Sequence, residues 1–106
     1  MEYTITAKHL RLPEPVKAYV EQKLSKLPRY YDGIGHVEVI FSGDTPGQVS
    51  VEIIAKAKRG VVFVATQDGH DLLGCLDAAI EKLARQLTKK KGIIRDHRQA
   101  KGKGIA

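Results

Sequence analysis

The sequence has little of what secreted, membrane-spanning or disulfide-stabilised proteins use. Cys75 is its single cysteine, so no disulfide can form within the chain, and no run of about 18 apolar residues is present. The first ten residues lack the basic start and the apolar core of a signal peptide. We therefore expect a cytoplasmic protein with no membrane segment. At 106 residues, one folded domain can bury its core without covalent crosslinks.

The sequence also lacks the motifs of common active sites. Its four histidines, at positions 9, 36, 70 and 97, have no cysteine at zinc spacing and no second histidine four residues away. Neither a phosphate-binding glycine loop nor a nucleophile elbow occurs. We predict no metal, no cofactor, no small-molecule substrate and no enzyme activity. The alternative is an acid–base pair of His70 with Asp68 or Asp71, although a helix N-terminus explains both aspartates without catalysis.

Positive charge is what the sequence has in excess, and it is concentrated at one end. Residues 82–106 contain nine of the 18 Lys and Arg residues but only one acid, Asp96. The first 81 residues contain nine bases and eleven acids. A nearly neutral body with a basic end favours a polyanionic partner.

Two surfaces are predicted on one helix over residues 71–91. An apolar stripe at helical spacing must face the core, and it consists of Leu73, Leu76, Ile80, Leu83 and Leu87. A basic row recurs at the same spacing on the opposite side of the helical wheel: Lys82, Arg85 and Lys89. Asp77 and Glu81 lie on a flank between them. A solvated face would show the same pattern, but the concentration of charge favours polyanion binding.

Alternating apolar residues predict strands at 3–7, 36–42, 49–56 and 61–67. A first helix is predicted from Glu14 to Leu27, ended by Pro28, with a smaller basic row at Lys23, Lys26 and Arg29. Asp68 is the predicted N-cap of the second helix.

The element order is β-α-β-β-β-α, which predicts an α+β two-layer sandwich with both helices on one face of a four-stranded sheet. Strands one and two can be parallel neighbours through a right-handed crossover, followed by an antiparallel meander. We expect a domain over residues 1–91 and a flexible basic tail over 92–106.

The blocks DAAIEKLARQLTKKKG, ATQDGHDL and ITAKHLRLPEPVKAYVEQKLSKLPRYYD resemble the short-form ribosome hibernation promoting factors, also called ribosome-associated inhibitors. The resemblance spans about residues 3–91 and implies a fold akin to double-stranded RNA-binding domains. It implies binding to rRNA of the small ribosomal subunit, and to the intact ribosome, in the channel used by mRNA and tRNA. Translation would thus be inhibited in stationary phase or stress. The family's rRNA-contacting positions match Lys23, Lys26, Arg29, Lys82, Arg85 and Lys89.

Off the ribosome we expect a monomer. Two alternatives stay open at this stage. One is a general double-stranded RNA-binding module without a ribosomal target, and the other is a small α+β enzyme that uses His70 with Asp68 or Asp71.

Overall fold

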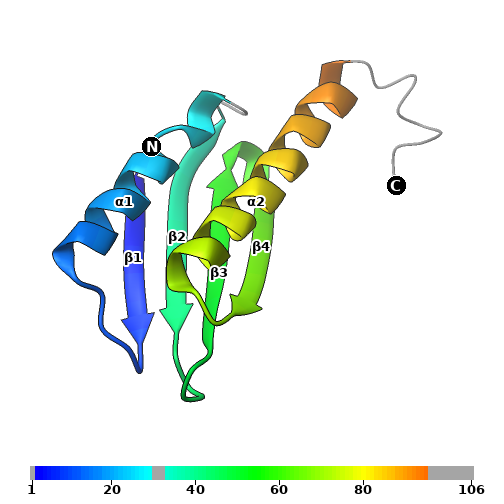
Figure 1. Ribbon diagram of the computed structural model, residues 1–106. Helices are drawn as coiled ribbons and strands as arrows, with labels where there is room; N and C mark the ends of the chain where they lie inside the picture. Colours follow the sequence, from blue (N-terminus) through cyan, green and yellow to red (C-terminus); the bar gives the residue numbers. More distant parts are fainter. Residues whose placement is uncertain (1, 30–32, 96–106) are drawn as a thin grey trace.

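Four strands form one mixed sheet in the computed structural model, which describes residues 2–29 and 33–95 (Figure 1). The spatial order of the strands follows the chain, and only the first pair is parallel. The strands are β1 (Glu2–Lys8), β2 (Ile34–Ser42), β3 (Val49–Ala57) and β4 (Val62–Gly69). The predicted parallel pair and antiparallel meander are confirmed.

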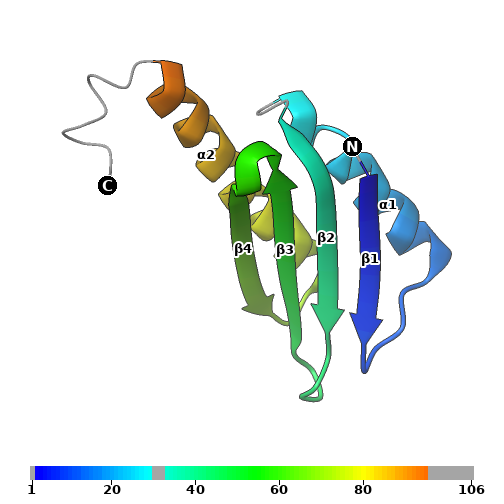
Figure 2. The ribbon, with the colours of Figure 1, turned by 180° about the vertical axis from the view of Figure 1, so that it is seen from behind.

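Both helices cover the same face of this sheet, as the two opposite views show (Figures 1 and 2). Helix α1 (Glu14–Leu24) lies over the β1 side and helix α2 (Leu72–Arg95) over the β3 and β4 side. Two single-turn 3-10 helices, η1 (Leu27–Arg29) and η2 (Lys58–Gly60), follow α1 and β3. The β-α-β-β-β-α two-layer fold predicted from the sequence is therefore correct.

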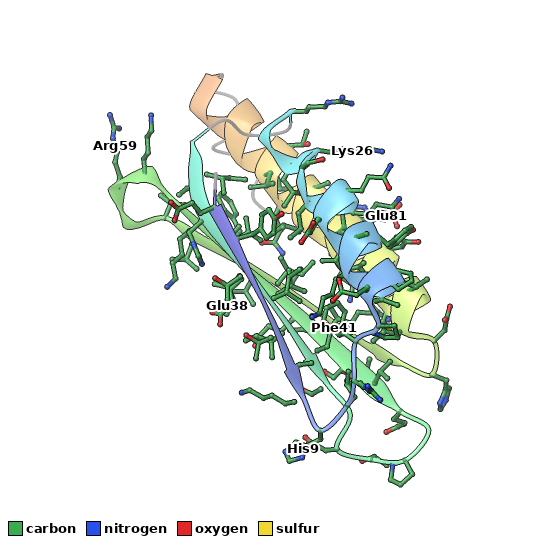
Figure 3. All side chains as sticks on the ribbon, turned by 90° about the vertical axis from the view of Figure 1, so that its left-hand side faces the viewer. His9, Lys26, Glu38, Phe41, Arg59 and Glu81 are labelled. Atoms are coloured by element: carbon green, nitrogen blue, oxygen red, sulfur yellow. The ribbon has the colours of Figure 1, made fainter. Side chains whose placement is uncertain are left out.

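The core lies between the sheet and the helices. Figure 3 shows Phe41 in this layer, whereas Glu38, on the same strand, points to the open face of the sheet. Burying one such aromatic or aliphatic side chain contributes about 1.5–3 kcal/mol. The largest fully buried side chains come from every element of the sandwich except β1 and β4: Phe41, Leu24, Leu27, Ile53, Leu76, Leu83, Leu87, Val20, Val37, Val39 and Val51.

Helix α2 is rotated about its axis relative to the predicted stripe. Leu73 is 36% exposed and is not part of the core, whereas Cys75 and Ala79 are buried beside Leu76. The buried face is thus centred closer to Cys75 and Ala79 than the leucine spacing indicates. Small residues at these positions allow the helix to approach the sheet there, and this packing fixes the rotation.

The ends of both helices also differ from the predictions. Helix α1 ends at Leu24, where the Ser25 hydroxyl donates to the Gln22 carbonyl over 2.7 Å and Lys26 N bonds to Lys23 O over 3.2 Å. Pro28 disfavours helical backbone at Leu27, so a separate turn, η1, follows and still buries Leu27.

Asp71 caps α2, and Asp68 does not, because Asp68 is still part of β4. The Asp71 carboxylate accepts a 3.1 Å hydrogen bond from Gly74 N, three residues later. A Cβ at position 74 would lie 2.7 Å from the same carboxylate oxygen, so glycine leaves room for the cap.

Helix α2 continues to Arg95 through Gly92, past the expected boundary at residue 91. Residues 96–106, most of the tail predicted to be flexible, lie outside the described residues.

Candidate nucleic-acid interface

Helices α1 and α2 run in the same direction, so their C-terminal ends lie toward the same end of the sheet (Figure 1). Each helix brings its basic row toward that end, where the helix dipole favours cations. The α1 row consists of Lys23, Lys26 and Arg29 and continues into η1. The α2 row consists of Lys82, Arg85 and Lys89. The fold thus brings together two rows that are far apart in the sequence.

Lys23 belongs to a polar cluster that joins the two helices. The Tyr19 hydroxyl of α1 donates to both carboxylate oxygens of Asp77 on α2, at 2.9 and 3.0 Å. The Lys23 ammonium lies 3.8 Å from an Asp77 oxygen and 5.4 Å from the centroid of the Tyr19 ring. We call these three residues the helix clasp. Asp77 therefore pairs with α1, and not within its own helix.

Lys82 is bonded to the sheet. Its ammonium donates to the Thr66 carbonyl over 3.0 Å, and the Gln86 amide donates to the Val64 carbonyl over 2.8 Å. Both carbonyls belong to β4, the edge strand. The prediction that Lys82 lies opposite the buried face is therefore wrong, because the rotation of α2 turns it toward this edge.

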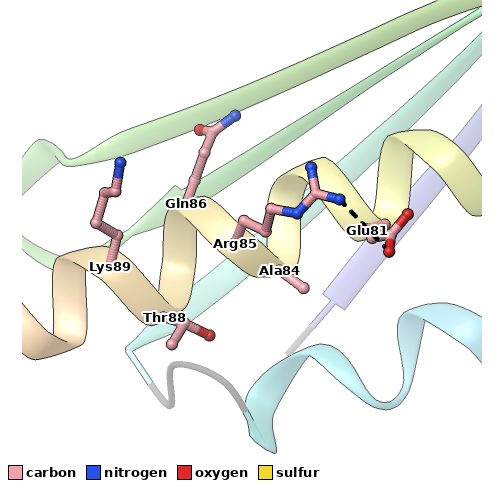
Figure 4. Close-up of a pocket in the computed structure, with 6 residues that line it drawn as sticks. All are labelled: Glu81, Ala84, Arg85, Gln86, Thr88 and Lys89. Atoms are coloured by element: carbon pink, nitrogen blue, oxygen red, sulfur yellow. Dashed lines mark ion pairs between the residues drawn. The ribbon is translucent and has the colours of Figure 1, made fainter. Parts of the chain in front are cut away.

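Arg85 and Lys89 remain directed to the surface along a hollow of about 670 Å³ (Figure 4). The Arg85 guanidinium lies 3.5 Å from the Glu81 carboxylate, and the two side chains are 70% and 68% exposed. Exposed pairs of this spacing stabilise a helix by about 0.3–0.5 kcal/mol, so phosphate can displace Glu81 easily.

Three further cations are exposed and have no carboxylate within ion-pair distance among residues 2–29 and 33–95: Lys26, Arg29 and Lys89. We call them the outer cations. Lys23 and Lys82, each bonded to another element of the fold, are the inner cations. The structure thus divides six predicted site residues into two inner cations, three outer cations and Arg85.

A third basic segment, formed by Lys56, Lys58 and Arg59, was missed in the sequence analysis. All three side chains are exposed, with Lys56 near the end of β3 and Lys58 and Arg59 in η2, between β3 and β4. Their closeness in sequence was a visible signal. The predicted parallel pair and antiparallel meander already place this connection at the same end of the molecule as the C-terminal ends of the helices, and the structure shows it there (Figure 1).

The groups of the alternative catalytic site take part in local structure. His70 Nδ1 lies 2.8 Å from the Gly47 carbonyl, to which it donates, and the Asp71 carboxylate caps α2. Burial, and next the charge of Asp71, raises the pKa of the Cys75 thiol, which favours its uncharged form. Within the described residues, no group of three His, Cys, Asp or Glu side chains could hold a metal ion.

The family model described as sigma 54 modulation protein / S30EA ribosomal protein matches residues 3–95. The chain belongs to this family. A ribosome hibernation promoting factor from Escherichia coli (strain K12) is 31% identical over 97 residues, covering 92% of this chain and 100% of the relative. One from Pseudomonas putida (strain KT2440) is 33% identical over 91 residues, covering 86% and 87%.

Solved structures agree with this S30EA-type fold. A ribosomal subunit interface protein from Coxiella burnetii matches with a TM-score of 0.78 and 23% identity, over 87% of this chain and 99% of that one. The N-terminal domain of Thermus thermophilus Protein Y matches with a TM-score of 0.73 and 25% identity, over 82% of this chain and 94% of that one.

In the part of the S30EA-family chain that is described, neither helix has the length and apolar content needed to cross a membrane.

Proposed function

We propose that this protein is a ribosome hibernation factor. It binds rRNA of the small ribosomal subunit, and the intact ribosome, and it inhibits translation in stationary phase or stress by occupying the mRNA and tRNA channel. The family match over residues 3–95 and the relatives named as ribosome hibernation promoting factors support this function. A cytoplasmic location follows from the location of its target.

The outer cations are the observation on which the proposed RNA contact depends. Lys26 and Arg29, just after α1 and in η1, and Lys89, in the C-terminal part of α2, are exposed. The C-terminal ends of both helices lie toward the same end of the sheet (Figure 1). Folded rRNA presents a dense phosphate surface that proteins recognise mainly through shape and backbone. A rigid arrangement of cations can therefore bind it with little dependence on base identity.

Arg85 adds a different kind of contact. Its guanidinium can bind a phosphate through two hydrogen bonds or stack on a base, which an ammonium cannot do equally well. The hollow along α2 gives an RNA group access to this side chain, and the exposed Glu81 is its present partner. Inhibition requires only occupancy of the channel, and no step of it breaks a covalent bond.

Sedimentation of purified small subunits with the protein, in the presence and absence of tRNA and mRNA, tests the proposal. We expect cosedimentation that saturating tRNA and mRNA abolish. Binding that tRNA and mRNA leave unchanged contradicts the occlusion mechanism. A generic RNA duplex at the same salt concentration is the control, and equal affinity for the duplex and the subunit would indicate a general duplex-binding module.

A further inference from the structure

The end of β3 and the η2 turn that follows it have the form of a binding segment. Lys56, Lys58 and Arg59 are exposed, and no carboxylate of residues 2–29 and 33–95 lies within ion-pair distance of their side chains. We call these three residues the basic turn. Three cations within four residues, without ion-pair partners, raise the free energy of this segment through mutual repulsion, and a polyanion would relieve that repulsion.

Arg59 is also in an unfavourable backbone conformation. Its φ is 63° and its ψ is 27°, in the left-handed region where a side chain is disfavoured and glycine is not. Gly60, the next residue, has a φ of 74°. A turn of this shape would be more stable with glycine at both positions. An arginine that costs stability at an exposed site points to a function for its side chain.

The basic turn lies at the same end of the sandwich as the C-terminal ends of both helices (Figure 1). Lys58 N donates to the Gly33 carbonyl over 3.1 Å, which ties η2 to the residue immediately before β2. On the other side, Lys89 extends from the same side of α2 as Gln86, which is bonded to β4 (Figure 4). The turn therefore lies at the end of the sandwich where the outer cations lie.

We propose that the basic turn is a third phosphate-binding segment, which contacts a stretch of RNA backbone separate from the one bound by the helical rows. Figure 3 shows Arg59 and Lys26 at the same end of the molecule but on opposite sides, one beyond the sheet and one on the helical layer. A backbone stretch that runs along the helical layer therefore lies on the opposite side of the sandwich from Arg59. This inference rests on the proposed function, because the RNA is the rRNA of the small subunit.

The test compares two double variants of the full chain that lose the same charge at opposite ends. Lys58→Ala with Arg59→Gly alters the basic turn. Lys8→Ala with Arg11→Ala removes two exposed cations, one at the end of β1 and one in the connection to α1, at the other end of the sheet (Figure 1). Affinity for purified small subunits is measured across a salt series, and the melting temperature is measured for each variant.

For the turn variant we expect a lower affinity and a log–log salt slope smaller by about 1.4–1.8, which corresponds to two phosphate contacts. The control should keep the wild-type slope. Equal losses in both variants would show an effect of net charge alone, and a wild-type slope in the turn variant would show that the turn does not contact RNA. Either result overturns the proposal. If the wild-type protein itself does not bind subunits, the proposed function fails first.

Two further measurements distinguish direct contact of the basic turn with RNA from an effect of the substitutions on protein stability. Arg59→Gly alone should raise the melting temperature while it lowers affinity, since it removes an unfavourable conformation and a ligand together. Hydroxyl-radical footprinting of the subunit should show that the turn variant loses protection at nucleotides different from those lost by Lys26→Ala with Lys89→Ala. Loss at the same nucleotides would contradict a separate backbone stretch.

Discussion

The α1 row and the α2 row are built alike, but their inner cations contact different parts of the protein. In each row the first cation is bonded to another element and the last is an outer cation. Lys23 reaches across to Asp77 and joins helix to helix, whereas Lys82 reaches Thr66 O and joins helix to sheet edge. The difference shows that a lysine on a basic face can have a structural partner, so its position in the row does not by itself make it an RNA ligand.

The bond made by Lys82 has a physical reason of its own. An edge strand presents carbonyl groups that would otherwise be open to pairing with another chain. Lys82 and Gln86 occupy two of those carbonyls on β4. On the α1 side no sheet edge is involved, and the helix clasp instead sets the separation of the two helices and of their outer cations.

Reversal of two outer cations, one from each row, should have the largest effect. We expect Arg29→Glu with Lys89→Glu to lower affinity for small subunits by about a hundredfold at 0.1 M salt, because each lost phosphate contact is worth roughly tenfold. Both side chains are exposed, so the free energy of unfolding should change by less than about 1 kcal/mol. Quantitative sedimentation and thermal denaturation are the measurements. A large fall in melting temperature would mean that these residues are part of the packing.

Removal of the Asp77 side chain should distinguish its role in positioning the two helices from the effect of its negative charge on RNA binding. Asp77→Ala takes a negative charge away from the interface, so electrostatics alone predicts tighter RNA binding. We expect weaker binding, because Tyr19 and Lys23 lose the partner that fixes α1 against α2. The free energy of unfolding should fall by about 1–2 kcal/mol.

Glu81→Ala is the matched control, since it removes the same charge from the same helix but affects only the pair with Arg85. It should leave subunit affinity unchanged or slightly higher. If Asp77→Ala and Glu81→Ala tighten binding equally, the helix clasp has no positioning role.

Methionine substitution should distinguish an inner cation from an outer one on the same helix. Lys82→Met keeps the apolar part of the side chain but loses the bond to Thr66 O, and we expect unfolding free energy to fall by about 1 kcal/mol. Lys89→Met should change stability by less than about 0.5 kcal/mol and reduce the salt slope of binding by about 0.7–0.9. Chemical denaturation measures the unfolding free energy, and a salt series measures the slope of binding. If Lys82→Met instead reduced the slope and Lys89→Met instead lowered stability, Lys82 would be the RNA ligand and Lys89 the structural residue.

The smallest effect is expected from the C-terminal residues, which add cations beyond the two rows. We propose that truncation after Arg95 leaves the fold intact and weakens subunit binding modestly, because Arg98, Lys101 and Lys103 are removed. The salt slope should fall by less than the about 2.1–2.7 expected for three full contacts, since ordering a chain end on RNA costs entropy. Affinity of full-length and truncated protein across the same salt series is the comparison. Identical slopes would confine binding to residues 1–95.

Local patterns in the sequence were sufficient for the architecture. Alternation with period two identified all four strands, and helical spacing identified both helices, because each pattern follows directly from backbone geometry. The apolar residues Leu76, Leu83 and Leu87 were correctly assigned to the core for the same reason. The resemblance of the sequence to hibernation factors also agreed with the family match over residues 3–95.

The tertiary structure alone decided the long-range partners of the charged residues. Leu73 and Lys82 were misplaced because spacing gives the width of a buried face but not the rotation at which a helix packs on its sheet. Tyr19 and Asp77 are 58 residues apart, and only the fold shows that Arg59 and Lys26 lie on opposite sides of the sandwich. Polar contacts of this kind depend on distances through space, and a local repeat in the sequence carries no information about such distances.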